Sequence, residues 1–221
     1  MPFDSAQVAR HRSGYGGMGS LVAADGSQTH PYLQRLQANA EPVRDLADAV
    51  HYLCILHGRH PGVIDHASAH ARPGIEQDWI EAAAEAFAAE RAFLVRIVAA
   101  AGPLPSTPGH AESEAAAAAQ RHALEMLAQS DRAGCAAGAA LALAIDWIEI
   151  RKVLEAAAVR VSFVPPPPTL PVLEETVTVI DALVRESAIE RAMLFGAQQL
   201  FAQHRGLWDL LEARASARDK Q

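Results

Sequence analysis

Lysine, cysteine and aromatic side chains are scarce in this chain of 221 residues. Lys152 and Lys220 are the only lysines, and the net charge of −7 excludes the basic face that a dedicated nucleic-acid binder needs. The two cysteines, Cys54 and Cys135, lie within helical patterns and do not form a disulfide framework. Aromatic residues make up 5% of the chain, which argues against a platform for stacked bases or flat cofactors. These absences leave an ordinary globular protein that is long enough for one sizeable domain.

The chain also lacks a long apolar run, and none of its runs reaches the roughly 18 residues that a membrane span needs. The longest candidate extends from Cys135 to Ile145 and is interrupted by Asp146. The first twenty residues, MPFDSAQVARHRSGYGGMGS, hold no apolar core of the kind found in a secretory signal. We therefore expect a cytoplasmic protein without a membrane span.

What the chain does contain is helical periodicity from residue 41 onward. Gly58 and Gly102 mark helix ends, because glycine favours C-terminal caps. Ser187 and Glu190 have the spacing of a capping box, which begins a helix. The pattern also allows one short helix near 31–40 and another near 63–70. The main predicted helices cover residues 43–57, 75–101, 110–129, 130–161, 172–185 and 187–214.

The same pattern predicts how the chain is organised. Residues 1–42 are predicted to be a flexible N-terminal arm, because their Gly/Ser-rich stretch has little to bury. Residues 43–221 are predicted to form a single helical-bundle domain. Its four prolines at 165–168 make a polyproline connector and not a domain boundary, since too little chain follows for a second core. The predicted fold class is all-α: a helical bundle of five to six helices with a flexible N-terminal arm and a polyproline connector.

Several polar residues interrupt apolar helix faces and are therefore candidates for a buried site. Glu90 interrupts the apolar seam of the helix at 75–101, and His204 is the polar member of the apolar face of the last helix. Asp146 and Glu149 lie one turn apart on a helix that is apolar in nearly every direction. A buried carboxylate needs a partner, which is either an arginine, a hydrogen-bond donor or a metal ion. The arginines considered for such pairs are Arg91, Arg121 and Arg151.

Five of the ten histidines lie within residues 51–70. The first of them share a spacing of three with Cys54, whereas His66 and His70 are four apart, as two metal-binding histidines on one helix are. Imidazole together with thiolate suits zinc, copper or iron. Alternatively, His57 is a hydrogen-bonded core residue in the apolar stripe of its helix, and the others are solvated. The candidate metal ligands from both sets are His51, Cys54, His57, His60, His66, His70, Glu90, Asp146, Glu149 and His204.

The stretch from AGPLPSTPGHAESE through ALEMLAQSDRAGCAAGAALALAIDW resembles a family of bacterial all-helical proteins of uncharacterised function, and the likeness covers residues 43–215. The helical layout is also similar to ferritin-like and haem-oxygenase-like bundles. It lacks their ligand motifs, because no glutamate in the chain has a histidine three residues later. This second likeness concerns the fold alone and assigns no site residue.

These observations lead to two functional hypotheses. The first is a binding or interaction protein that forms a homodimer, because alanine-rich apolar helices leave a surplus face for a partner. The alternative is a metal- or haem-dependent oxidoreductase or ligand-binding bundle, which would use the core histidines and carboxylates with iron, haem or zinc. We expect self-association, and neither nucleic acid nor a membrane as partner. The sequence identifies no substrate and no small-molecule ligand.

Overall fold

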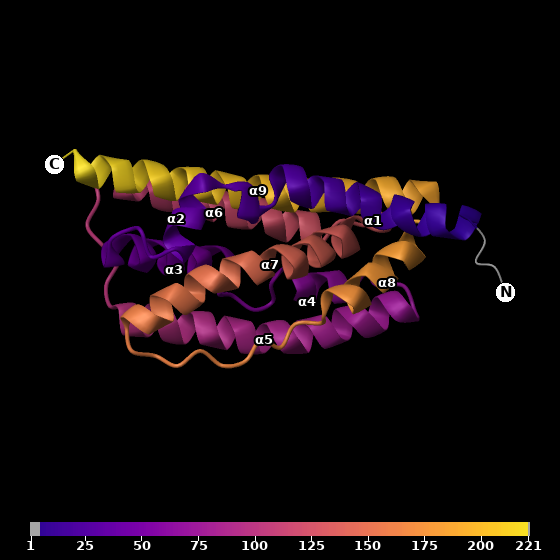
Figure 1. The fold of residues 1–221 in the computed structure, drawn as a ribbon, viewed down its shortest axis with the longest axis horizontal. Helices are drawn as coiled ribbons and strands as arrows, with labels where there is room; N and C mark the ends of the chain where they lie inside the picture. The colour runs from indigo at the N-terminus through magenta and orange to yellow at the C-terminus, as the bar shows by residue number, and fades with distance from the viewer. Residues whose placement is uncertain (1–4, 221) are drawn as a thin grey trace.

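The computed structural model describes residues 5–220, with side chains from Tyr15 onward, and in this range the chain folds into helices without strands (Figure 1). The all-α class is thus confirmed, but the predicted number of five to six helices is wrong, since the described residues form nine α-helices. The elements are α1 (Ser5–Asp25), η1 (Ser27–Thr29, a 3-10 turn), α2 (Pro31–Gln37), α3 (Val43–His57), α4 (Val63–Ser68), α5 (Ile75–Ala101), α6 (His110–Ala128), α7 (Cys135–Arg160), α8 (Leu173–Leu183) and α9 (Ser187–Asp219).

The three further helices explain the difference in number. The segments at 31–40 and 63–70, where a short helix was allowed, contain α2 and α4. Helix α1 has no counterpart in the prediction, because its glycines are poor helix formers in isolation. Packing against the bundle supplies the stability that local propensity lacks, since a helix in a protein is held mainly by its buried face. Met18, in the middle of α1, is fully buried.

The segment predicted to be a flexible arm lies on the bundle over its described residues. Helix α1 runs alongside α9 in Figure 1, and the two helices are in contact. In α2, the side chains of Tyr32, Leu33 and Leu36 are each at most 1% exposed to solvent. Residues 1–4 lie outside the described residues, and the mobility of the segment stays a prediction. Its buried apolar side chains favour a docked position.

Helix α7 forms the centre of the bundle and is buried along most of its length, as its apolar pattern predicts. Its closest neighbour is α9. A Cβ atom at Gly138 would lie 2.0 Å from the carbonyl oxygen of Met193, and one at Gly196 would lie 2.1 Å from that of Cys135. Glycine at these two positions is therefore what allows the backbones of α7 and α9 to meet.

The proline connector between α7 and α8 is held to the bundle at two points. The guanidinium group of Arg151 donates a hydrogen bond to the carbonyl oxygen of Pro166, and the Thr169 hydroxyl donates to the carbonyl oxygen of Ala86 over 3.0 Å. The connector thus lies against the bundle as a strap. Among the helices of residues 5–220, none combines the length and the hydropathy that crossing a membrane would take.

Candidate functional site

One buried network of polar contacts in the core centres on the carboxylate of Asp146. This carboxylate accepts a hydrogen bond of 2.8 Å from the backbone N–H of Ser27 and one of 2.5 Å from the Ser27 hydroxyl. Nδ1 of His204 lies 2.6 Å from Oδ2 of Asp146, and Nε2 of His204 lies 2.9 Å from Nε2 of His57. All four residues are at most 3% exposed. Four elements, η1, α7, α9 and α3, thus contribute one side chain each to a single chain of contacts, which we call the buried polar chain.

The protonation pattern of the buried polar chain follows from its donors and acceptors. His204 donates a hydrogen bond from Nδ1–H to the carboxylate, so in its neutral form its Nε2 accepts a hydrogen bond from Nε2–H of His57. Burial lowers the pKa of His57 well below its ordinary value of 6.5, and the neighbouring His204 and Arg91 lower it further. His57 is therefore uncharged at neutral pH, packed edge-on against the rings of Phe87 and Trp147.

The buried polar chain fastens the N-terminal segment to the bundle. Trp208 on α9 donates from Nε1 to the Ser27 hydroxyl over 2.8 Å. The Ser27 hydroxyl thus donates one hydrogen bond, to Asp146, and accepts one, from Trp208. Nearby, Nε2 of His30 lies 3.0 Å from the Asp209 carboxylate, and its Nδ1 accepts the backbone N–H of Tyr32. Since Ser27 lies two residues beyond the end of α1, these bonds fix where α1 leaves the surface of α9.

A second buried polar contact joins α5 to α7. The carboxylate of Glu90 pairs with the guanidinium group of Arg151 and accepts a hydrogen bond of 3.1 Å from Nε1 of Trp147. Both members of the ion pair are nearly excluded from solvent. Arg151 is thus the ion-pair partner of the buried Glu90 carboxylate, as one of the alternatives from the sequence predicts.

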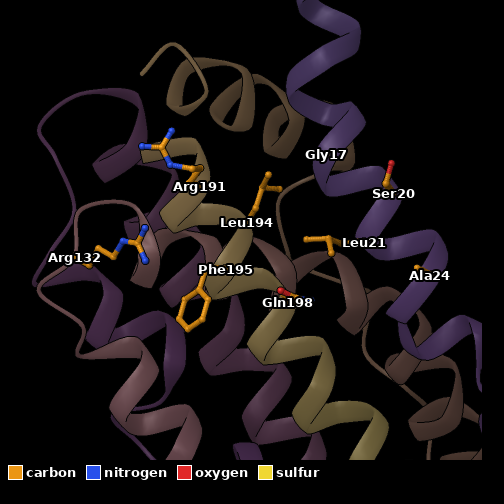
Figure 2. A pocket seen from close by; sticks show the side chains of 9 residues that line it. All are labelled: Gly17, Ser20, Leu21, Ala24, Arg132, Arg191, Leu194, Phe195 and Gln198. Atoms are coloured by element: carbon orange, nitrogen blue, oxygen red, sulfur yellow. The ribbon is translucent and has the colours of Figure 1, made fainter. Parts of the chain in front are cut away.

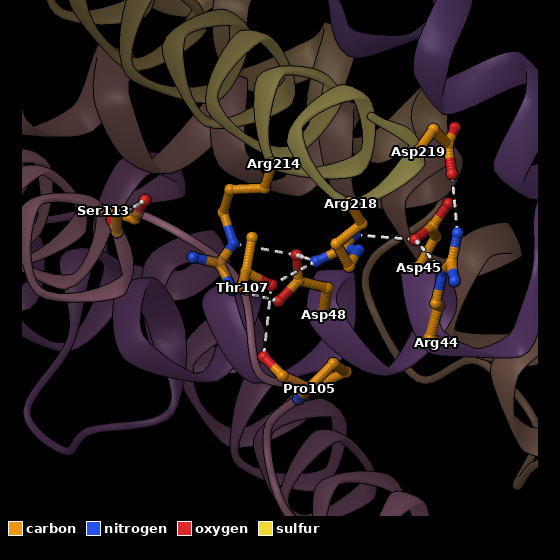
Figure 3. A network of polar contacts seen from close by, with 10 residues as sticks. Arg44, Asp45, Asp48, Pro105, Thr107, Ser113, Arg214, Arg218 and Asp219 are labelled. Atoms are coloured by element: carbon orange, nitrogen blue, oxygen red, sulfur yellow. Dashed lines mark hydrogen bonds and ion pairs between the residues drawn. The ribbon is translucent and has the colours of Figure 1, made fainter. Parts of the chain in front are cut away.

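A third polar cluster ties α3 to the C-terminal end of α9 (Figure 3). Arg214 forms a bidentate pair with Asp48 at 2.8 Å, and Arg218 bridges Asp48 and Asp45 at 2.8 and 2.6 Å. The Thr107 hydroxyl accepts hydrogen bonds from both arginines. Burial raises the pKa of Asp45, although its bond to Arg218 opposes this shift. Two carboxylates facing two guanidinium groups balance in charge, so we assign the cluster a structural role.

The structure separates most of the ten candidate metal ligands and brings three of them together: His57, Asp146 and His204. The carboxylate of Glu149 faces Gln37 and Lys152 at the rim of α7 and not the core. The remaining candidates lie elsewhere: His51 bonds to the carbonyl oxygen of Gly102, Cys54 is a half-buried free thiol, His60 lies beside Asp65, His66 is half-buried on α4, His70 lies beside Asp131, and Glu90 pairs with Arg151.

The geometry of the buried polar chain differs from that of a metal coordination shell. Its residues form a line, because His204 uses one ring nitrogen toward Asp146 and the opposite one toward His57. Ligands of one ion point to a common centre. Within residues 15–220, no group of three or more histidine, cysteine or acidic side chains is placed to hold a metal ion. Metal binding by the candidate ligands stays a prediction.

A surface hollow of about 670 Å³ lies over α1 and α9, and we call it the arginine groove (Figure 2). Leu21 and Leu194 lie between the two helices, while Arg132, Arg191 and Phe195 lie on the side of α9 away from α1. Phe195 is 44% exposed, and the guanidinium carbon of Arg132 is 6.0 Å from its ring centre. The residues that line the arginine groove are Gly17, Ser20, Leu21, Ala24, Arg132, Arg191, Leu194, Phe195 and Gln198.

The charge of the arginine groove is opposite in sign to the net charge of the chain. No acidic side chain is among the described residues that line it, and no ion pair between residues 15 and 220 includes Arg132 or Arg191. The chain as a whole carries a net charge of −7. Arg132 and Arg191, for which no carboxylate partner lies among residues 15–220, therefore place positive charge beside the exposed Phe195.

Sequence patterns did not reveal Ser27 of the buried polar chain, or Phe195 and Arg191 of the arginine groove, because their local sequence signals are weak. Ser27 meets Asp146 from a distance of 119 residues along the chain, and no spacing rule connects the two. Phe195 and Arg191 are four residues apart, so they lie on one face of a helix, and this spacing was the available signal for an outward-facing patch.

Fold and site together define a helical-bundle protein with three buried polar clusters that join its helices and a basic, partly apolar groove that faces solvent. The chain belongs to the Family of unknown function (DUF6975), whose family model matches residues 22–219. A search of curated proteins found no match, and neither did a search of solved structures. Family membership agrees with the resemblance to proteins of uncharacterised function, whereas the similarity to ferritin-like and haem-oxygenase-like bundles stays a prediction.

Proposed function

We propose that this protein is an interaction protein that forms a homodimer and uses the arginine groove as its binding surface. One observation carries the proposal: Arg132 and Arg191, without carboxylate partners among the described residues, lie beside the exposed Phe195. An aromatic side chain flanked by arginines is the composition that is enriched at the centres of protein interfaces.

The energetics favour covering this surface. Removing an exposed phenylalanine from water releases about 25 cal/mol for each Å² of apolar area, and an aromatic residue at the centre of an interface contributes about 2 kcal/mol or more. The arginines add direction, because a bidentate guanidinium–carboxylate pair has fixed geometry. A partner surface with an apolar recess and carboxylates beside it would match both.

The buried polar chain has a positioning role in this proposal. Helix α1 supplies one wall of the arginine groove through Gly17, Leu21 and Ala24. The bonds of Ser27 to Asp146 and Trp208 hold the end of that helix in place. A wall held by buried hydrogen bonds reduces the entropy that a binding surface loses when its partner docks.

Light scattering coupled to size-exclusion chromatography tests the proposal. We expect the full chain to elute with twice the mass of the 23.5 kDa monomer. Phe195→Ala and Arg191→Glu are expected to weaken the dimer by about thirtyfold in Kd each, because a central aromatic and its flanking charge are lost. The matched controls Val164→Ala and Arg59→Glu change an exposed apolar residue and an exposed arginine outside the groove, and they should remain dimeric.

A monomeric wild-type chain at concentrations of about 100 μM would overturn the proposal, since it implies a binding energy below that of ordinary transient interfaces. A dimer that Phe195→Ala and Arg191→Glu leave intact would overturn the assignment of the groove as its surface.

A further inference from the structure

A second hollow lies at the surface between α5 and α8, with a volume of about 330 Å³. Its apolar part comes from Ile75, Trp79 and Val179, while Asp78 and Glu175 contribute carboxylates. No lysine, arginine or histidine is among the described residues that line it. The full lining is Ile75, Asp78, Trp79, Ala82, Pro171, Glu175, Thr178 and Val179, and we call it the acidic recess.

The acidic recess and the arginine groove are complementary in charge. The groove presents an exposed phenylalanine between arginines, and the recess presents an apolar hollow between carboxylates. A cavity of about 150 Å³ is enough to take up a benzene ring, so the recess has room for the ring of a phenylalanine. Ile75 at its edge is 46% exposed and would be covered by the same contact.

We infer that in the homodimer Phe195 of one copy enters the acidic recess of the second copy, where Arg191 and Arg132 meet Asp78 and Glu175. This inference rests on the proposed function and names the surface that occupies the groove. The guanidinium–carboxylate pairs lie at the edge of the contact and set its direction, while the aromatic ring provides most of the buried apolar area.

The two surfaces lie toward the same end of the bundle, the groove on α1 and α9 and the recess between α5 and α8 (Figure 1). The start of α5, α8 and the start of α9 lie at the same end of the bundle (Figure 1). In a two-fold dimer, a contact from groove to recess on one side is repeated from recess to groove on the other. Each dimer therefore contains the phenylalanine contact and its charge pairs twice.

The first test fills the recess. Ala82 is exposed and lines it, so Ala82→Trp places a large side chain where the ring of Phe195 would bind. We expect at least about a thirtyfold weaker Kd by analytical ultracentrifugation. The matched control is Ala89→Trp, at an exposed position of the same helix outside the recess. Circular dichroism should show equal helix content and equal thermal stability for both variants.

The second test exchanges charges between the two surfaces. Arg191→Glu alone and Asp78→Arg alone should each weaken the dimer by about thirtyfold in Kd, because each places like charges across the contact. An equimolar mixture of these two variants should form a heterodimer, since every contact in it again joins opposite charges. The double variant Arg191→Glu/Asp78→Arg should likewise recover the homodimer.

The outcomes separate this inference from the proposed function. If Phe195→Ala breaks the dimer while Ala82→Trp leaves it intact, the groove binds some other surface and the inference is overturned. If the mixture of Arg191→Glu and Asp78→Arg associates no more tightly than either variant alone, the charge pairing is overturned. Loss of the dimer in Ala82→Trp, together with recovery in the mixture, supports the inference.

Discussion

Replacing Ser27 by alanine removes one oxygen atom and breaks the buried polar chain at its N-terminal end. Two hydrogen bonds are lost: the one from the hydroxyl to Asp146 and the one that it accepts from Trp208. A hydrogen bond to a charged group contributes about 1.5–3 kcal/mol, and a buried N–H left without a partner costs about 1–3 kcal/mol. We therefore expect Ser27→Ala to lower the free energy of unfolding by about 3–5 kcal/mol.

Urea unfolding followed by circular dichroism, at one fixed chain concentration, measures this loss. The matched control is Ser216→Ala, which removes the same atom from an exposed position and should change stability by less than about 0.5 kcal/mol. Hydrogen exchange adds the location of the effect. Amides of the described N-terminal segment, which Ser27 fastens, should exchange faster in Ser27→Ala, whereas those of α7 should change less.

A loss below about 1 kcal/mol in Ser27→Ala would refute the reasoning, because it is smaller than the cost of the unpaired indole N–H alone. Equal acceleration of exchange in all helices would refute the local part, since it would show that Ser27 supports the whole bundle and not the placement of α1.

The remaining predictions concern proton uptake, helix packing and metal content. His57 has a lowered pKa in the folded state, so the unfolded state binds the proton first as pH falls. The free energy of unfolding should therefore fall below about pH 6.5, by up to about 1.4 kcal/mol per pH unit. Urea midpoints that stay constant from about pH 7.5 to 5.5 would contradict this. Gly138→Ala should cost about 3 kcal/mol, because its Cβ would clash with the backbone of Met193, whereas Gly16→Ala, with open space around it, should stabilise by up to about 1 kcal/mol in the same assay. Protein purified without a histidine tag should retain less than about a tenth of an equivalent of iron or zinc by mass spectrometry, because the donors of the buried polar chain bond to one another; a full equivalent would favour the oxidoreductase alternative.

Much of the helical framework can be predicted from the sequence, because its signals are local. Helices α3 and α5 have the predicted bounds, and α9 begins at the predicted Ser187. Gly58 and Gly102 are the C-cap residues of α3 and α5, although only Gly102 has the positive φ, 78°, that favours glycine. Helix α1 escaped prediction because its glycines give a weak helical signal, and contact with α9 decides its conformation.

The candidate site was only partly predictable, because its contacts join distant parts of the chain. Helical periodicity identified Glu90, Asp146 and His204 as inward polar residues, and each of them has a buried partner. Which partner each one meets depends on the rotation of α5, α7 and α9 about their axes, which periodicity does not specify. The pairing of Asp146 with Ser27 also requires the docked N-terminal segment, which the composition of that segment does not predict.

The central claim, that the arginine groove is a surface between two copies, is tested most directly by cross-linking from Phe195. A photo-reactive phenylalanine analogue at this position, in an equimolar mixture of 15N-labelled and unlabelled chains, is irradiated and the joined peptides are identified by mass spectrometry. We predict cross-links between labelled and unlabelled chains that end at residues 75–82 or 171–179, the segments that line the acidic recess. Cross-links confined to peptides of a single chain would contradict the claim.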